Sequence, residues 1–142
     1  MRSLIFILFS LSCGLAWASS CEDTARALNR QLNPRINASE LAGILTSLNQ
    51  NGHLPDQFVT KKFAMAHGWH PGSSLQTALP GKSIGGDHFG NYEKRLPKGQ
   101  YTEADLDYRG GKRGAKRIVF SQMQRFVTVD HYNSFLEVPS CQ

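Results

Sequence analysis

The sequence lacks internal repeats, low-complexity tracts and any stretch typical of a linker between domains. Its 142 residues are therefore expected to form one domain around one hydrophobic core. A metal-binding cluster is also missing: His67 and His70 lie three positions apart, but no carboxylate accompanies them. Gly68 and Trp69 between them end a predicted helix, so both histidines are interpreted as surface residues and no metal site is expected.

A nucleotide-binding loop is excluded for a similar reason. "GKS" (81–83) matches the end of the phosphate-binding loop motif, but that motif needs a glycine five positions earlier, where Gln76 stands. The motif also needs a helix directly after it, and "IGG" (84–86) is a poor helix start. We therefore expect no nucleotide cofactor, and no other cofactor.

One long apolar run is present, and it lies at the N-terminus. Arg2 precedes "LIFILFSLSCGLAW" (4–17), which is too short to span a bilayer comfortably. "AWA" (16–18) has the small residues of a cleavage site, so residues 1–18 are interpreted as a signal peptide removed before Ser19. The predicted location is secreted or periplasmic, with no membrane attachment after cleavage. An uncleaved membrane anchor is the alternative.

Cleavage would change the charge and the cysteine count. Loss of Arg2 lowers the Lys and Arg total from 16 to 15 against 11 Asp and Glu, so the net charge falls from +5 to +4. Loss of Cys13 leaves Cys21 and Cys141, and two cysteines in an exported protein most simply form one disulfide. A sequence pI near 9.3 suggests an acidic partner such as nucleic acid, although many secreted proteins are basic without binding one.

Helical patterns fill the first half of the chain. Asn37 and Glu40 form a capping box, apolar residues follow at helical spacing, and Gly52 is suited to ending the helix. Shorter helices are expected at 21–33 and at 60–68.

The second half of the chain alternates between apolar and polar residues instead. These segments are rich in β-branched and aromatic residues and are separated by turn-prone residues. Helices first and strands afterwards predict an α+β fold with N-terminal helices followed by a twisted antiparallel β-sheet. The strand candidates are 101–108, 116–122, 125–132 and 134–138.

Charged residues in the strand half form a suggestive set. Glu103 and Asp105 share one face of a strand, because alternate residues of a strand point the same way. The turn at 109–117 is basic and glycine-rich, and "DHY" (130–132) ends a later strand. A carboxylate, a histidine and several cations on one sheet face suit the cleavage of RNA by an acid and a base. From spacing alone, solvated strand charges explain the pattern equally well.

Several longer motifs occur together in one order: "LPDQFVTK", "GW", "PGKSIGGD" with the following "F", "N" and "E", then "EAD", "R...RI" and "DHY". Through these motifs the chain resembles the barnase-like family of secreted, guanyl-preferring microbial ribonucleases. The resemblance runs from about Glu40 to Phe135 and implies the barnase-like microbial ribonuclease fold.

The resemblance implies a role for each residue of the catalytic set. Glu103 matches the general base and His131 the general acid. Arg113 and Arg117 match arginines that bind phosphate, for which a planar guanidinium is well shaped. Lys61 matches a lysine carried by a helix in the same cleft.

The resemblance also implies a loop that reads guanine. Asn91 and Glu93 match this loop, and a carboxylate can accept from the N1–H and N2–H₂ groups that adenine lacks. Tyr132 matches an aromatic residue that packs on the base, Phe89 supports the loop, and Asp87 holds the cleft floor through hydrogen bonds to nearby cations. The expected substrate-binding residues are Phe89, Gly90, Asn91, Tyr92, Glu93 and Tyr132.

The chain departs from the family pattern within this loop. Tyr92 stands where the family pattern has an arginine, and Gly90 stands where it has a serine. The first change removes a positive charge, so we expect the Glu93 carboxylate to be less neutralised. These departures concern guanine affinity and inhibitor binding more than the reaction itself.

The expected organisation is a signal peptide (1–18), an N-terminal extension with Cys21 (19–36) and a ribonuclease domain (37–142). The expected activity is metal-independent cleavage of single-stranded RNA 3′ of guanosine, through a 2′,3′-cyclic phosphate, by a monomer. The resemblance adds a barstar-like acidic protein as a candidate inhibitor. The alternatives are a non-catalytic basic protein that binds polyanions or acts against microbes, and a toxin, for which no delivery domain is visible.

Overall fold

The computed structural model describes residues 19–142, so the predicted signal peptide lies outside the described residues. Within 19–142, no helix combines the length and the apolar character needed to cross a membrane.

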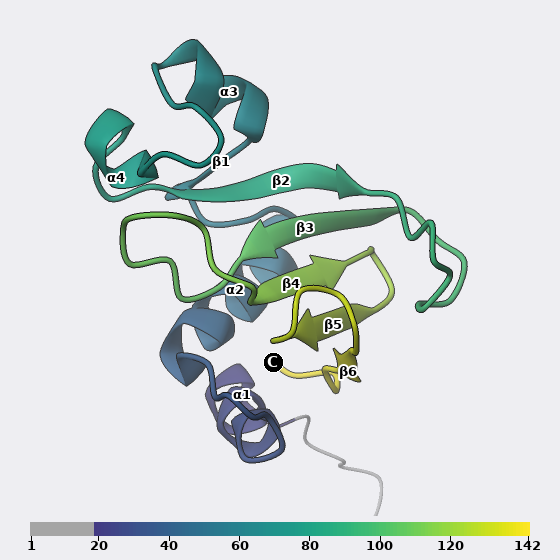
Figure 1. Cartoon of the computed structure of the whole chain (residues 1–142). Helices are drawn as coiled ribbons and strands as arrows, with labels where there is room; N and C mark the ends of the chain where they lie inside the picture. The colour runs from purple at the N-terminus through teal and green to yellow at the C-terminus, as the bar shows by residue number, and fades with distance from the viewer. Residues whose placement is uncertain (1–18) are drawn as a thin grey trace, which may run out of the picture.

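Four helices precede most of a six-stranded sheet, which confirms the predicted α+β class (Figure 1). The strands lie in the order β1-β2-β3-β4-β5-β6. β1 and β2 are parallel, and each later strand is antiparallel to the one before it. The elements are α1 (Cys21–Asn29), α2 (Ala38–Asn51), β1 (Phe58–Val59), α3 (Lys61–Ala66), α4 (Leu75–Ala78), β2 (Ser83–Phe89), β3 (Tyr101–Asp105), β4 (Arg117–Phe120), β5 (Arg125–Thr128) and β6 (Leu136–Glu137).

The start of α2 confirms one half of the predicted capping box. The Asn37 side chain accepts a hydrogen bond from the Glu40 N–H at 2.9 Å, and Gly52 ends the helix with a left-handed backbone. The second bond of a capping box, from the Asn37 N–H to the Glu40 side chain, is replaced by bonds to Asp107. The Glu40 carboxylate accepts from the Asp107 N–H at 2.7 Å, and Asp107 accepts from the Asn37 N–H at 2.8 Å. This exchange ties the start of α2 to the chain that leaves β3.

α1 is shorter than the sequence pattern predicts, ending at Asn29 rather than at position 33. The Asn29 side chain donates to the Ile36 carbonyl at 2.9 Å and accepts from the Ile36 N–H at 2.8 Å. A side-chain amide that bonds the backbone in this way closes a loop, so the chain turns here and α2 begins soon afterwards. The loop contains a cis Asn33–Pro34 bond.

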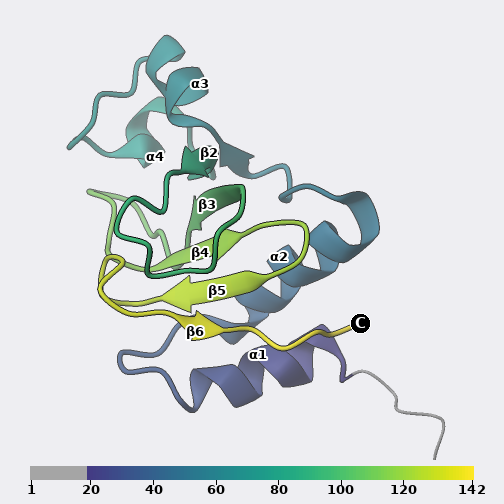
Figure 2. The ribbon, with the colours of Figure 1, turned by 90° about the vertical axis from the view of Figure 1, so that its right-hand side faces the viewer.

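The two faces of the sheet have different partners. α1 and α2 pack on one face (Figure 2), where Ala104, Ile118 and Val127 join the apolar residues of both helices in one buried cluster. The other face carries a second cluster that includes Tyr101 and Val119. Because strand residues alternate between faces, Glu103, Asp105 and Arg117 share this second face.

The disulfide between Cys21 and Cys141 is present, as predicted. Both cysteines are buried in the main cluster. The Cys21 N–H donates to the Gln142 carbonyl at 3.2 Å, and the Asn49 side chain of α2 donates to the Cys141 carbonyl at 2.9 Å. The N-terminal extension is therefore packed into the same hydrophobic core as the sheet.

Removing this bond should destabilise the protein without changing its chemistry. The bond joins residues 120 positions apart, so the double variant Cys21→Ala/Cys141→Ala gains chain entropy when unfolded and should lose roughly 2–5 kcal/mol of unfolding free energy. Urea unfolding measures this loss. Equal unfolding midpoints for both proteins, or loss of activity while the variant remains folded, would contradict the role assigned to the bond.

Candidate active site

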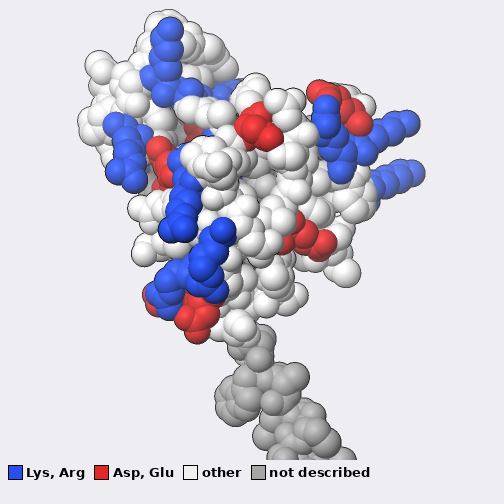
Figure 3. All heavy atoms as spheres, turned by 60° about the horizontal axis from the view of Figure 1, so that its bottom comes forward, with Lys and Arg blue, Asp and Glu red and all other residues white. Residues whose placement is uncertain are grey.

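The described surface carries an excess of positive charge. Figure 3 shows one face, on which Lys and Arg gather at the left side and at the right-hand tip while Asp and Glu lie in smaller patches. The right-hand tip is where the segment after β2 lies in Figure 1. This distribution favours polyanionic partners in general but does not by itself define a site.

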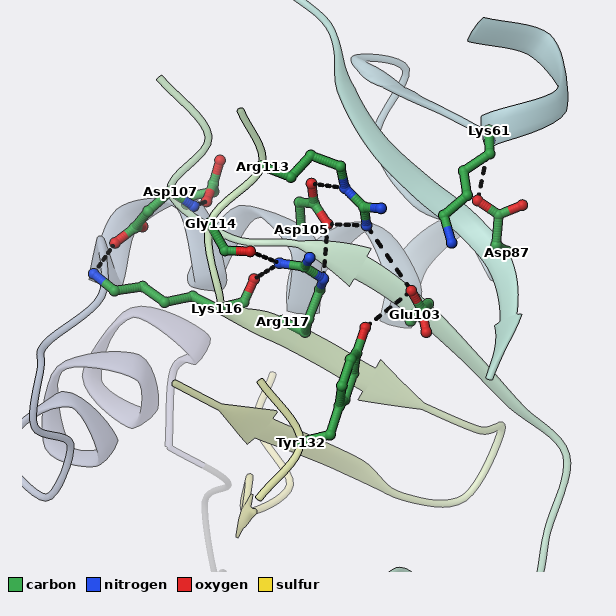
Figure 4. Close-up of polar contacts among 11 residues, drawn as sticks. Lys61, Asp87, Glu103, Asp105, Asp107, Arg113, Gly114, Lys116, Arg117 and Tyr132 are labelled. Atoms are coloured by element: carbon green, nitrogen blue, oxygen red, sulfur yellow. Dashed lines mark hydrogen bonds and ion pairs between the residues drawn. The ribbon is translucent and has the colours of Figure 1, made fainter. Parts of the chain in front are cut away.

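A buried ion cluster lies on the sheet face opposite the helices (Figure 4). Asp105, whose side chain is 2% exposed, accepts from Arg113 Nη2 at 2.6 Å and from Arg113 Nε at 2.8 Å. The Nε of Arg117 lies 3.0 Å from Asp105 Oδ1 as an ion pair, without the alignment of a hydrogen bond. Arg117 Nη1 donates to the carbonyls of Gly114 and Lys116, both at 2.8 Å. One carboxylate thus holds two guanidinium groups, so these three side chains together carry one positive charge.

Glu103 lies beside this cluster. Its Oε1 is 4.0 Å from Arg113 Nη2 and accepts a hydrogen bond from the Tyr132 hydroxyl at 3.0 Å. Burial disfavours the charge on Arg113, but the hydrogen bonds and negative charge of Asp105 outweigh it, so the pKa of Arg113 is raised. Burial, followed by the negative charge of Glu103, raises the pKa of Tyr132 to about 12. The Tyr132 hydroxyl therefore stays protonated at neutral pH and donates to Glu103.

His131 follows β5 in an unusual backbone conformation. His131 and Tyr132 both have positive φ, 54° and 71°, a region that side chains other than glycine rarely adopt. The Tyr132 N–H donates to the Thr128 hydroxyl at 3.0 Å, and Asp130 accepts from the Ser134 N–H at 3.0 Å. The hydrogen bond from the Ser134 side chain lowers the pKa of Asp130. These bonds hold the turn that carries His131.

A backbone bond joins this turn to the arginine loop. The His131 N–H donates to the Ala115 carbonyl at 3.1 Å, between Arg113 and Arg117 in the sequence. The His131 side chain is exposed, and its ring lies 4.8 Å from that of Tyr132, centroid to centroid. The histidine is thus held next to the residues around Glu103.

Lys61 reaches the same neighbourhood through Asp87. It is the first residue of α3, and its backbone N–H donates to Asp87 Oδ2 at 3.0 Å. Asp87 is paired with Glu103 across β2 and β3. The bond formed by Asp87 therefore goes to a backbone N–H rather than to the Lys61 ammonium group, so Asp87 positions α3 instead of neutralising a cation.

A cavity of about 280 Å³ opens beside Glu103. Its lining includes every residue expected to bind substrate, together with three that sequence reasoning missed: His88, Arg95 and Phe135. Arg95 lies two positions after Glu93, but in a loop this spacing does not by itself indicate a pair. Lys61, Arg113, Arg117 and His131 do not line this cavity. The lining residues are His88, Phe89, Gly90, Asn91, Tyr92, Glu93, Arg95, Glu103, Tyr132 and Phe135.

The loop after β2 is closed by its own asparagine. Asn91 donates to the Leu96 carbonyl at 2.9 Å and accepts from the Leu96 N–H at 3.1 Å. The two departures in this loop are in contact, because the Tyr92 ring lies over Gly90, where a Cβ atom would require the ring to shift. This tyrosine is 90% exposed.

The chain thus has helices on one face of the sheet and clustered arginines with carboxylates on the other. The chain belongs to the ribonuclease family, because the model of that family, described as ribonuclease, matches residues 44–139. It is therefore an RNA-cleaving enzyme. α1 and the start of α2 precede the matched region.

Individual ribonucleases show the same relationship. A ribonuclease of Heyndrickxia coagulans is 41% identical over 101 residues, which cover 68% of this chain and 93% of that protein. Ribonucleases of Bacillus intermedius and Bacillus pumilus are 41% identical over 101 residues as well, covering 68% of this chain and 62% of each of those proteins.

The raised pKa of Tyr132 predicts a pH dependence of stability. A tyrosine whose pKa is higher in the folded state stabilises that state below its ordinary value of 10 and loses this contribution as the pH rises to about 12. The unfolding free energy of the wild type should therefore fall between these values, and that of Tyr132→Phe should fall less. Urea unfolding at pH 9 and at pH 11.5 tests this. Equal decreases in unfolding free energy for the wild type and for Tyr132→Phe would contradict the raised pKa of Tyr132.

Proposed function

We propose that the chain is a guanyl-preferring endoribonuclease that cleaves single-stranded RNA by general acid–base catalysis. The observation that supports this most is the position of Glu103. Its carboxylate lies beside Arg113, accepts a hydrogen bond from the Tyr132 hydroxyl at 3.0 Å, and also lines the cavity beside the loop after β2. A general base next to both a phosphate-binding surface and a cavity for a nucleobase is well placed to promote attack of a ribose 2′-OH on the phosphate of the same nucleotide.

In the proposed reaction, Glu103 removes the proton of the ribose 2′-OH. The 2′-oxygen then forms a bond to phosphorus, and the bond from phosphorus to the 5′-oxygen breaks. His131 gives its proton to this departing oxygen. The product is a 2′,3′-cyclic phosphate, which a water molecule opens in a slower step with Glu103 and His131 in exchanged roles.

Arg113 and Arg117 are proposed to stabilise the charge on the phosphate oxygens. Because Asp105 already fixes their guanidinium groups, they need little reorganisation when charge develops on the phosphorane-like transition state. These arginines provide the positive charge in a mechanism that we propose is independent of metal ions. Lys61, at the start of α3, is proposed to add a further cation to the cleft.

The cavity is proposed to hold guanine. Glu93 would accept from N1–H and N2–H₂, and Asn91 would shape the loop. Phe89 and Tyr132, whose ring centroids are 5.2 Å apart, provide the aromatic surface on which the base packs. A site built around an acceptor rejects an analogue without the matching donors, because a buried polar group is then left unpaired.

The proposal extends to location and partners. A signal peptide at 1–18 would export the enzyme, in agreement with the disulfide. The exported enzyme would act as a monomer. We propose a barstar-like acidic protein as its inhibitor, because the excess of cations on the enzyme would attract an acidic partner.

Two substitutions test the acid and base. Glu103→Gln keeps the shape but loses the base, and His131→Ala loses the acid, so each should lower kcat by roughly 10²–10⁴-fold, the usual contribution of such groups. His53→Ala, which alters an exposed histidine elsewhere, is the matched control and should keep wild-type rates. Cleavage of GpU, a guanosine–uridine dinucleotide, measures these rates.

Folded Glu103→Gln and His131→Ala variants with near-wild-type rates would rule out the mechanism. The same variants separate an enzyme from a polyanion-binding protein. Glu103→Gln should still bind RNA while no longer cleaving it.

A second comparison tests the base preference. The wild type should cleave GpU faster than ApU, and Glu93→Gln should lose much of this difference, because the amide replaces one acceptor oxygen with a donor. Glu137→Gln, which removes one negative charge on β6, should keep the preference. A Glu93→Gln variant with the full wild-type preference would refute the guanine-reading role of Glu93.

A further inference from the structure

Glu93 stands in an exposed part of the loop after β2. Its side chain is 73% exposed, so a free carboxylate there would move among several rotamers. The neighbouring Tyr92 offers no charge that could hold it. The carboxylate nevertheless has a fixed partner two residues further on.

Arg95 provides that partner. Its Nε and Nη2 atoms both lie 3.0 Å from Glu93 Oε2, and its Nη1 donates to the Asn133 carbonyl at 2.9 Å. All three nitrogens of the guanidinium are thus used. Asn133 lies two positions after His131, so one side chain joins the loop after β2 to the turn that carries the histidine.

We propose that Arg95 is a specificity-determining positioning residue, which holds the Glu93 carboxylate in the orientation that accepts a guanine base. This inference rests on the proposed function. Arg95 supplies a positive charge beside Glu93, where the tyrosine at position 92 supplies none.

The number of acceptor positions fits this role. A carboxylate offers about four lone-pair positions. Arg95 uses one of them on Oε2 through the hydrogen bond from Nε, and its Nη2 pairs with the same oxygen, which leaves Oε1 to receive the N1–H and N2–H₂ donors of the base.

The packing of the loop supports the same role. Asn91 and Leu96 hold both ends of the loop through two reciprocal hydrogen bonds, so Arg95 projects from a fixed backbone. The Arg95 side chain is 45% exposed, and an exposed ion pair contributes little to stability on its own. The two contacts on Oε2 and the hydrogen bond to the Asn133 carbonyl instead restrict orientation, so the effect should appear in base discrimination rather than in stability.

The test compares kcat/KM for GpU and ApU in Arg95→Ala, Arg95→Lys and Lys94→Ala. Arg95→Ala should lower the ratio of the two values roughly three- to tenfold, mainly through a higher KM for GpU, while changing the ApU value less than about twofold. Arg95→Lys keeps the charge but loses the planar guanidinium that makes these contacts together, and should be intermediate. Lys94→Ala removes the neighbouring exposed cation of the same loop and should keep the wild-type ratio.

A double substitution completes the test, because Arg95 is proposed to act through Glu93. Adding Arg95→Ala to Glu93→Gln should then cause little further loss of discrimination. Fully additive losses would overturn the proposal, as would equal losses on GpU and ApU or an equal effect of Lys94→Ala. A wild type without any preference for GpU would instead refute the guanosine preference on which the inference rests. Thermal unfolding midpoints confirm that each variant is folded.

Discussion

The ion cluster around Asp105 is the constraint on which the proposed site depends. Two arginines would repel each other on a partly buried sheet face, and the one carboxylate between them makes their proximity possible. Removing one partner of a buried pair typically costs about 3–5 kcal/mol, because the other charge is left uncompensated. Such a loss would also disturb the proposed substrate-binding face, because Arg113 lies 4.0 Å from Glu103.

The fold could be predicted largely from local patterns. Asn37 and Gly52 indicate where α2 begins and ends, and alternation along the strands indicates which residues share a face. The end of α1 could not be predicted from its own residues, because the Asn29 side chain binds Ile36 in the following loop. The exchange between Glu40 and Asp107 escaped prediction for the same physical reason, since it joins residues 67 positions apart.

In the candidate site, too, residues within motifs could be predicted from the sequence, whereas contacts between distant residues could not. Motif resemblance found most of the residues that line the cavity, namely Phe89, residues 90–93, Glu103 and Tyr132. It did not find Arg95, because no motif position marks the contact with the Asn133 carbonyl, 38 residues away. The substitutions at positions 90 and 92 look independent in the sequence, but in the structure the Tyr92 ring lies over Gly90 and occupies the space that a Cβ atom would take. Both results depend on side-chain contacts that only the folded chain defines.

The central claim is that Glu103 and His131 cleave RNA by transfer of the phosphate to the neighbouring 2′-oxygen. Phosphorus NMR of GpU during incubation with the mature protein in the presence of a chelator tests this claim most directly. The account predicts that guanosine 2′,3′-cyclic phosphate appears first and that guanosine 3′-phosphate follows from it. The 3′-phosphate as the first product, with no cyclic intermediate, or cleavage that stops when the chelator is added, would contradict the account.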